Sequence, residues 1–170
     1  MNVGAHGDSY KTTGIVYGRE LLREIAPQRI AVDAGSWEGL IESFSVEKRL
    51  LLTHTDFGSF LEKTGNKGYM SPLRAEYLKL WDCVEIGRRL ARSGTLIEQP
   101  RGSILAGVTP EELEENTSER DWGNGFMSRW CIQFAQRERS IALPGGQRSS
   151  LREWLIDRLA EIADLPATPC

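Results

Sequence analysis

Cysteine is scarce in this sequence, and a long apolar run is missing. The 170 residues include three cysteines, Cys83, Cys131 and Cys170, which are odd in number and far apart. That pattern argues against a disulfide framework and against a zinc site, and it favours a reducing, cytoplasmic location. No apolar segment reaches the roughly 20 residues that a transmembrane helix needs, and no signal peptide is recognisable, so the sequence predicts no membrane partner.

The sequence also has no excess of positively charged residues. Lysine and arginine number 21 against 24 aspartates and glutamates, which gives a net charge of -3. Proteins that bind nucleic acid through a broad surface are usually basic, so any contact with DNA would have to come from a local patch. The chain has neither an internal repeat nor a low-complexity tract, and its length suits one domain with a sizeable core.

Helical periodicity and short apolar runs alternate along the chain. The patterns predict helices at 12–26, 36–44, 73–92, from Pro110 onward and at 150–163. They predict strands at 29–35, 49–54, 102–109 and 128–136. This alternation indicates an α/β fold with a mainly parallel sheet, whose ligands bind beyond the carboxyl ends of the strands.

The C-terminal part of the chain is set off from the rest by a polar, glycine-containing stretch. We therefore divide the sequence into a domain at 1–146 and a tail at 147–170. The tail comprises a linker and an amphipathic helix, which is predicted to pack on the same domain. Trp154 is the residue expected to anchor it there.

The segment "VGAHGDSYKTTG", residues 3–14, contains the parts of a phosphate-binding loop. Such a loop needs glycines for close backbone approach, a lysine for the outer phosphates and a hydroxyl for Mg²⁺. These parts are present as Gly4, Gly7, Lys11, Thr12 and Thr13. The strict pattern G-x-x-x-x-G-K-[ST] has glycine where this chain has Tyr10. The alternative is an ordinary N-terminal segment with a chance Lys-Thr pair, and the motif by itself leaves both open.

Polar residues follow two of the predicted strands. Asp56 comes after the strand at 49–54, where a carboxylate can hold Mg²⁺ and orient the attacking water, or can simply cap the next helix. His54 stands where a first acid is expected, and we interpret it as a hydrogen-bonded strand-end residue rather than a metal ligand. Thr109 is placed to sense a γ-phosphate and also to cap the helix at Pro110, and the two roles are compatible.

Two further groups of cations are candidates for contacts with phosphates. Arg129 follows an Asn-Gly turn, and an arginine there can reach a phosphate across a subunit boundary, which would make the protein a homo-oligomer. A polar stretch combines cations with an aromatic ring, as contacts to single-stranded DNA require, although it can equally be a solvated loop. Its residues are Lys63, Lys67, Tyr69 and Arg74. Arg88, Arg89 and Arg92 need no ligand, because they complement the C-terminal dipole of the predicted helix at 73–92.

In order and spacing, "LLLTHTDFGSFL", "GSILAGVTPEEL" and "NGFMSRW" resemble the RecA-like ATPase domain of phage and mobile-element primase–helicase proteins. "SWEGLI" is similar to that family's "SGEGLI", and the resemblance covers roughly residues 3–146. A non-glycine before the lysine is common in that family, so Tyr10 fits. The resemblance implies a three-layer RecA-like P-loop NTPase with a mainly parallel sheet, which binds ATP and Mg²⁺ and hydrolyses ATP in a homo-oligomeric DNA helicase or primase–helicase.

The resemblance also implies roles for individual residues. Lys11 would neutralise the phosphates, Thr12 and Asp56 would hold Mg²⁺, Thr109 would sense the γ-phosphate, and Arg129 would act on a neighbouring subunit's nucleotide. The chain departs from the family in two respects: His54 replaces an acid, and the strand that should precede the phosphate loop is expected to be missing, which implies an N-terminally truncated copy of the domain. The alternative is therefore a catalytically inactive remnant of the same fold that binds DNA or a protein. For a small α/β enzyme unrelated to nucleotides, no competing set of residues is present.

Overall fold

The chain folds around a small parallel sheet. The computed structural model describes residues 1–4, 11–31, 36–65, 72–89, 94–134 and 149–165. Within them, four parallel strands pair in the order β2-β5-β1-β6. The strands are β1 (Asn2–Val3), β2 (Arg49–His54), β5 (Arg101–Val108) and β6 (Gln133–Phe134). The prediction of a mixed α/β fold with a parallel sheet is confirmed, and its two long strands lie close to their predicted bounds.

The expectation that the first strand is missing is wrong. Asn2 and Val3 form β1, which pairs with β5 on one side and with β6 on the other. Val3 is fully buried, and the backbone N–H of Gly4 donates to the carbonyl of Val108 at 3.1 Å. Sequence patterns find strands as apolar runs of four or more residues. Here two residues suffice, because a neighbouring strand on each side supplies backbone partners.

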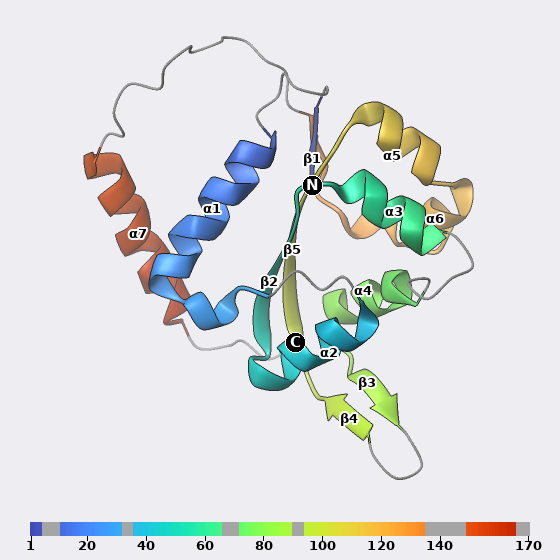
Figure 1. Cartoon of the computed structure of the whole chain (residues 1–170), viewed down its shortest axis with the longest axis horizontal. Coiled ribbons are helices and arrows are strands. Elements are labelled where there is room, and N and C mark those ends of the chain that lie inside the picture. The colour runs from blue at the N-terminus through green and yellow to red at the C-terminus, as the bar shows by residue number, and fades with distance from the viewer. Residues whose placement is uncertain (5–10, 32–35, 66–71, 90–93, 135–148, 166–170) are drawn as a thin grey trace.

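Helices lie on both faces of the sheet. They are α1 (Lys11–Ile25), α2 (Trp37–Val46), α3 (Phe57–Gly65), α4 (Leu73–Trp81), α5 (Pro110–Asn116), α6 (Glu119–Gly123) and α7 (Ser149–Ala163). Figure 1 shows α1 and α7 on one side of the sheet, and α3 and α4 on the other. The helix start expected at Ser36 is confirmed, since its hydroxyl accepts a hydrogen bond from the backbone N–H of Gly39 at 3.1 Å.

The main hydrophobic core lies between the sheet and the helices α2, α3 and α4. Its largest fully buried side chains include Phe44, Phe57, Phe126, Leu40, Leu61 and Leu73. On the other face, α1 buries Ile15 and Leu21. Because apolar side chains on both faces of the sheet are removed from water, β5 is held from both sides, and its carboxyl end is fixed relative to α1 and α3.

The long helix predicted at 73–92 is wrong beyond Trp81. The chain reverses at Cys83, which has a φ of 50°, and then forms an antiparallel hairpin of β3 (Ile86–Arg89) and β4 (Gly94–Ile97). Ile86 lies opposite Ile97, and both side chains are buried. Burying these two side chains stabilises the hairpin more than the local helical preference of the segment stabilises a helix. Arg88 and Arg89 therefore belong to a strand rather than a helix end, and Arg92 lies outside the described residues.

Two shorter strands were predicted too long. In the segment at 29–35, Ile30 forms a single parallel bridge with Leu51, and residues 32–35 lie outside the described part of the chain. In the segment at 128–136, a turn of 3₁₀ helix (Met127–Arg129) comes first, and strand pairing is confined to Gln133 and Phe134. The first segment lies beside β2 and the second lies beside the two-residue strand β1, so each has only a short stretch of backbone to pair with.

The structure bears on two expectations drawn from composition, the state of the cysteines and the lack of a transmembrane helix. Cys83 is disulfide-bonded, which the small number of cysteines did not predict, whereas Cys131 is free and exposed. Among the described helices, none has the length and apolar character needed to cross a membrane.

The C-terminal helix α7 is present and lies beside α1. Arg152 of α7 forms an ion pair with Glu24 of α1, and the Arg29 guanidinium donates to the carbonyl of Ala163 at 2.7 Å. Trp154 does not anchor this helix, because its side chain faces outward and is 54% exposed. Polar contacts at the two ends of α7 thus hold it in place.

Gly58 allows α3 to cross closely over α5. A Cβ at this position would lie 2.8 Å from Cδ and 2.9 Å from Cβ of Glu112. We expect Gly58→Ala to destabilise the protein by about 1–3 kcal/mol despite the better helix propensity of alanine, because the two helices must separate. Urea unfolding measures the change. Gly14→Ala in α1, where a Cβ would meet nothing within 4 Å, is the matched control and should be neutral or stabilising. Equal stability of Gly58→Ala and the wild type would contradict this account.

Candidate functional site

The carboxyl ends of β1, β2 and β5 meet at one edge of the sheet. Because these strands are parallel, Gly4, Asp56 and Thr109 follow their strands at the same edge. The connection from β1 to α1 passes through residues 5–10, which include Gly7 and lie outside the described residues. Helix α1 then begins at Lys11, and the structure brings this lysine to the edge as well.

Lys11 lies against β5 at a position without a side chain. A Cβ on Gly107 would be 3.6 Å from both Cγ and Cδ of Lys11, and 2.9 Å from Cδ1 of Ile15. Because Gly107 has no side chain, the aliphatic part of the Lys11 side chain can pack against the carboxyl end of β5. The positive charge of Lys11 also makes a small contribution to lowering the pKa of Asp56, after those of Ser59 and Lys63. The sequence analysis missed the part played by Gly107.

Asp56 caps α3. Its Oδ1 accepts from the backbone N–H of Ser59 at 3.1 Å, and its Oδ2 accepts from the Ser59 hydroxyl at 2.6 Å. These two bonds, the side-chain one first, hold the pKa of Asp56 below its ordinary value, with smaller contributions from Lys63 and Lys11. The capping role is confirmed. Because the residue is exposed and each carboxylate oxygen can accept a further bond, the ionised group is also free to bind water or a cation.

Thr109 caps α5 through reciprocal bonds with Glu112. The threonine hydroxyl accepts from the backbone N–H of Glu112 at 3.2 Å and donates to the Glu112 carboxylate at 2.8 Å. The same carboxylate accepts from the backbone N–H of Thr109 at 3.1 Å. Thr109 is 5% exposed, so its capping role is confirmed, and contact with a ligand would require it to exchange its bond with Glu112. The Thr-x-x-Glu spacing was the signal that could have identified Glu112.

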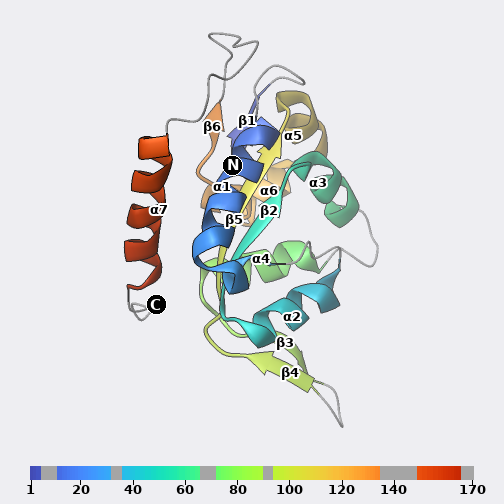
Figure 2. The ribbon, with the colours of Figure 1, turned by 60° about the vertical axis from the view of Figure 1, so that its left-hand side comes forward.

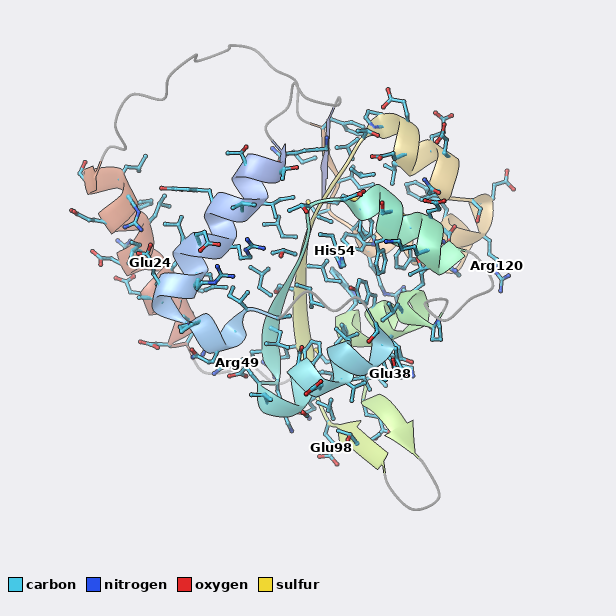
Figure 3. All side chains as sticks on the ribbon, viewed as in Figure 1. Glu24, Glu38, Arg49, His54, Glu98 and Arg120 are labelled. Atoms are coloured by element: carbon cyan, nitrogen blue, oxygen red, sulfur yellow. The ribbon has the colours of Figure 1, made fainter. Side chains whose placement is uncertain are left out.

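His54 turns toward α4 at the end of β2. Figure 3 shows the His54 side chain on the side of the sheet that faces α4. Its Nε2 lies 2.8 Å from the Tyr77 hydroxyl, and its ring centroid lies 4.7 Å from that of Phe60. The interpretation of His54 as a hydrogen-bonded strand-end residue is confirmed. In the described part of the chain, no group of three or more His, Cys, Asp or Glu residues is placed to hold a metal ion. A Mg²⁺ ion at this edge would therefore depend on isolated oxygen donors.

The first turn of α1 presents hydroxyls and no carboxylate. Thr12 and Thr13 are exposed there, and acidic residues are absent from that turn. The first N–H groups of a helix have no partner within the helix, and the helix dipole favours an anion beside them. This end of α1 therefore has the electrostatic character that a phosphate needs.

Arg129 lies at the other end of the sheet. It precedes β6, which is parallel to β1, so it belongs to the edge where the strands begin. Its guanidinium lies 3.1 Å from the Asp82 carboxylate and donates to the carbonyl of Gly125 at 3.1 Å. Arg129 therefore cannot join Lys11 and Asp56 within one chain.

Arg74 is engaged inside the molecule, contrary to the expectation that it contacts DNA. Its guanidinium lies 2.5 Å from the Asp121 carboxylate and donates to the carbonyl of Leu61 at 2.6 Å and to the hydroxyl of Thr64 at 3.0 Å. Of the other residues proposed for DNA contact, Lys63 is exposed at the end of α3. Lys67 and Tyr69 lie outside the described residues.

No family model, curated protein or solved structure matches this chain. The geometry of this edge of the sheet and the motifs that lead into it are therefore the observations that bear on function.

Proposed function

We propose that the chain binds a nucleoside triphosphate with Mg²⁺ at the carboxyl edge of the sheet and hydrolyses it. One observation carries the proposal: Lys11, the first residue of α1, packs on Gly107 of β5 at the same edge of the sheet at which Asp56 follows β2. A lysine at a helix start beside a strand-end carboxylate is the pairing that phosphate and Mg²⁺ need.

The order of the strands supports a RecA-like P-loop fold with three layers. The strand before the phosphate loop, β1, is separated by β5 from β2, which ends at Asp56. The strand between them ends at Thr109, so a γ-phosphate held at the start of α1 would lie between the ends of β1 and β2 and close to this residue. Helices on both faces of the sheet agree with this arrangement (Figure 1).

Each residue at the edge has a chemical task in this proposal. The Lys11 ammonium binds phosphate oxygens, and the N–H groups at the start of α1 stabilise their negative charge. Thr12 and Asp56 supply the hard oxygen donors that Mg²⁺ prefers, with water completing the coordination. Bound there, Mg²⁺ would offset charge on the phosphates. Asp56 also accepts a hydrogen bond from the attacking water and so orients it.

The wider context we propose is the ATPase domain of a mobile-element DNA helicase or primase–helicase. This part rests on the motif resemblance over residues 3–146 and on Lys63, whose exposed ammonium is available to a DNA phosphate. Arg129 is left out of the proposed site of a single chain because of its place at the opposite edge. A role for it on a neighbouring subunit's nucleotide would require the two chains to meet through these two edges.

A second candidate is nucleotide binding without turnover. The observation that favours it is the engagement of two polar side chains near the end of β2: Asp56 with Ser59, and His54 with Tyr77. An NTPase usually has a further acid at this point, and His54 occupies that place here. Binding would then serve to order the fold for contact with DNA or a protein, as in the inactive remnant considered above.

Lys11→Met tests the binding site. The variant keeps the apolar stem on Gly107 and removes the charge, so binding of a fluorescent ATP analogue with Mg²⁺ should weaken by about 10- to 100-fold, in line with the loss of hydrogen bonds to a charged group. Lys63→Met removes an exposed lysine of the same edge region and is the matched control, with an expected change of less than about twofold. Equal affinity of Lys11→Met and the wild type would exclude the phosphate-loop assignment.

A further inference from the structure

A cavity of about 270 Å³ lies between α4, the first half of β5 and the segment that precedes β6. Figure 2 shows α4 beside the lower part of β5, and the two elements are in contact. Gly102, Ser103 and Ile104 of β5 line this cavity. The proposed nucleotide site lies at Gly107 and Thr109, toward the other end of the strand. The cavity is therefore a separate site, and a ligand in it would not depend on nucleotide binding.

Aromatic side chains form much of the cavity wall. Tyr77 and Phe126 are 5% and 1% exposed, and the ring centroid of Trp130 lies 5.9 Å from that of Phe126 in an edge-to-face arrangement. Trp81, the last residue of α4, also lines the cavity but is 63% exposed, so the cavity reaches the surface at this residue. Aromatic side chains around a small volume suit a planar ring, which can pack against their faces and edges.

The volume of the cavity suits one small ring system. An apolar cavity of about 150 Å³ in a protein accommodates benzene. A cavity of about 270 Å³ therefore has room for a ring of that size together with a second fused ring or a short polar substituent. This size indicates a compact aromatic molecule as the ligand.

The polar part of the wall is cationic. Among the described residues that line the cavity, Arg129 has the only charged side chain. Its Nη2 donates to the two carboxylate oxygens of Asp82 at 3.2 and 3.1 Å, and its Nη1 donates to the carbonyl of Gly125 at 3.1 Å. Its Nε is buried and has no hydrogen-bond partner within the described part of the chain. An unpaired buried donor is costly, so an anionic acceptor in the cavity would complement this arginine.

We propose that this cavity binds a small aromatic carboxylate. The ring packs among Tyr77, Trp81 and Phe126, and the carboxylate accepts hydrogen bonds from Arg129. A guanidinium has five N–H groups, so Arg129 can bind the ligand and keep its contact with Asp82 on the outer side. The apolar wall supplies affinity for the ring, and the arginine selects an acid over a neutral or basic molecule of the same shape.

Isothermal titration calorimetry of the whole chain with indole-3-acetate tests this proposal. We expect saturable binding of one molecule per chain. Indole-3-acetamide has nearly the same shape without the charge, and it should bind about 10-fold more weakly or worse, because its bond to Arg129 is not charge-assisted. Absence of saturable binding to the folded protein up to about 10 mM indole-3-acetate would overturn the proposal, as would equal affinities for the acid and the amide.

Arg129→Met assigns the carboxylate to this arginine. The variant keeps an apolar stem and removes the charge, so indole-3-acetate should bind about 10-fold more weakly or worse and lose its advantage over the amide. Arg158→Met on α7 also breaks an exposed ion pair, lies outside the cavity lining and is the matched control, with an expected change of less than about twofold. Unchanged preference for the acid in Arg129→Met would overturn the role of Arg129.

Trp81→Ala locates the ring in the cavity by a route that does not involve charge. The exposed position makes the variant tolerable to the fold, and loss of the indole wall should weaken binding of both the acid and the amide by about fivefold or more. Trp122→Ala on α6 replaces a tryptophan that is 52% exposed and does not line the cavity, so it is the matched control and should bind as the wild type does. Equal binding by Trp81→Ala and the wild type would overturn the assignment of the ligand to this cavity.

Discussion

Arg74→Met should destabilise the protein by about 3–5 kcal/mol, the usual cost of breaking a buried ion pair from one side. The Arg74 and Asp121 side chains are 15% and 9% exposed, so the variant leaves the Asp121 carboxylate buried without its cation. The same guanidinium bonds to the carbonyls of Leu61 and Asn116, so the ends of α3 and α5 lose partners as well. Urea unfolding at neutral pH measures the loss.

Arg158→Met provides the matched control for this experiment. Arg158 pairs with Glu161 at 2.6 Å, but both side chains are more than half exposed. Exposed pairs contribute about 0–1 kcal/mol, so this variant should be nearly as stable as the wild type. A loss below about 1 kcal/mol in Arg74→Met would contradict the structural role given to the Arg74–Asp121 pair.

The pH dependence of stability gives a second signature of this pair. Burial raises the pKa of Asp121, but hydrogen bonds from Ser118 and Arg74 outweigh it, and the pKa is lowered from 3.8. A carboxyl whose pKa is lower in the folded state stabilises the fold above its unfolded pKa, and this contribution is lost as the pH falls through the folded value. The difference in unfolding free energy between wild type and Arg74→Met should therefore shrink below about pH 4. If the difference in unfolding free energy stayed constant as the pH falls, the coupling between Arg74 and the ionised Asp121 would be contradicted.

Asp56→Asn should lower ATP turnover by about 10²-fold or more and leave nucleotide binding nearly intact. The amide keeps the shape and a carbonyl that can accept from Ser59, but it removes the charge that polarises the attacking water, while Thr12 and the phosphates would still hold Mg²⁺. A steady-state phosphate-release assay, combined with the binding titration, separates the two effects.

Ser59→Ala is the control that separates catalysis from helix capping. It removes the hydroxyl that donates to Asp56 at 2.6 Å, which is one of the two hydrogen bonds of the cap. The Asp56 carboxylate itself stays in place. Turnover should remain within a few-fold of the wild type once stability is matched. Equal turnover in Asp56→Asn and wild type would exclude a catalytic role for Asp56. A wild type that binds nucleotide without measurable hydrolysis would favour the second candidate function.

Local sequence patterns predicted those strands and helix starts that depend on neighbouring residues rather than on distant partners. The apolar runs of β2 and β5 carry their strand character within a few residues, and the Thr109–Pro110 pair marks the start of α5. The capping roles of Asp56 and Thr109 were among the alternatives, because an aspartate or threonine before a helix is a local signal. The same patterns predicted which strand ends carry polar side chains.

Features that depend on distant partners were not predictable. The two-residue strand β1 exists because β5 and β6 supply its hydrogen bonds, and the β3–β4 hairpin because Ile86 and Ile97 are buried together. Arg74 looked like a surface cation, since its partner Asp121 lies 47 positions away. The contact of Lys11 with Gly107 likewise joins distant parts of the chain, so no local spacing reports it.

Equilibrium binding of MgATP to the wild-type chain, measured by isothermal titration calorimetry, tests the central claim most directly. We predict saturable binding of one ATP per chain, weakened when EDTA removes Mg²⁺, because Thr12 and Asp56 would then hold no cation between them and the phosphates. Absence of saturable binding at millimolar ATP, with the protein folded, would contradict the assignment of a nucleotide site to the carboxyl edge of the sheet.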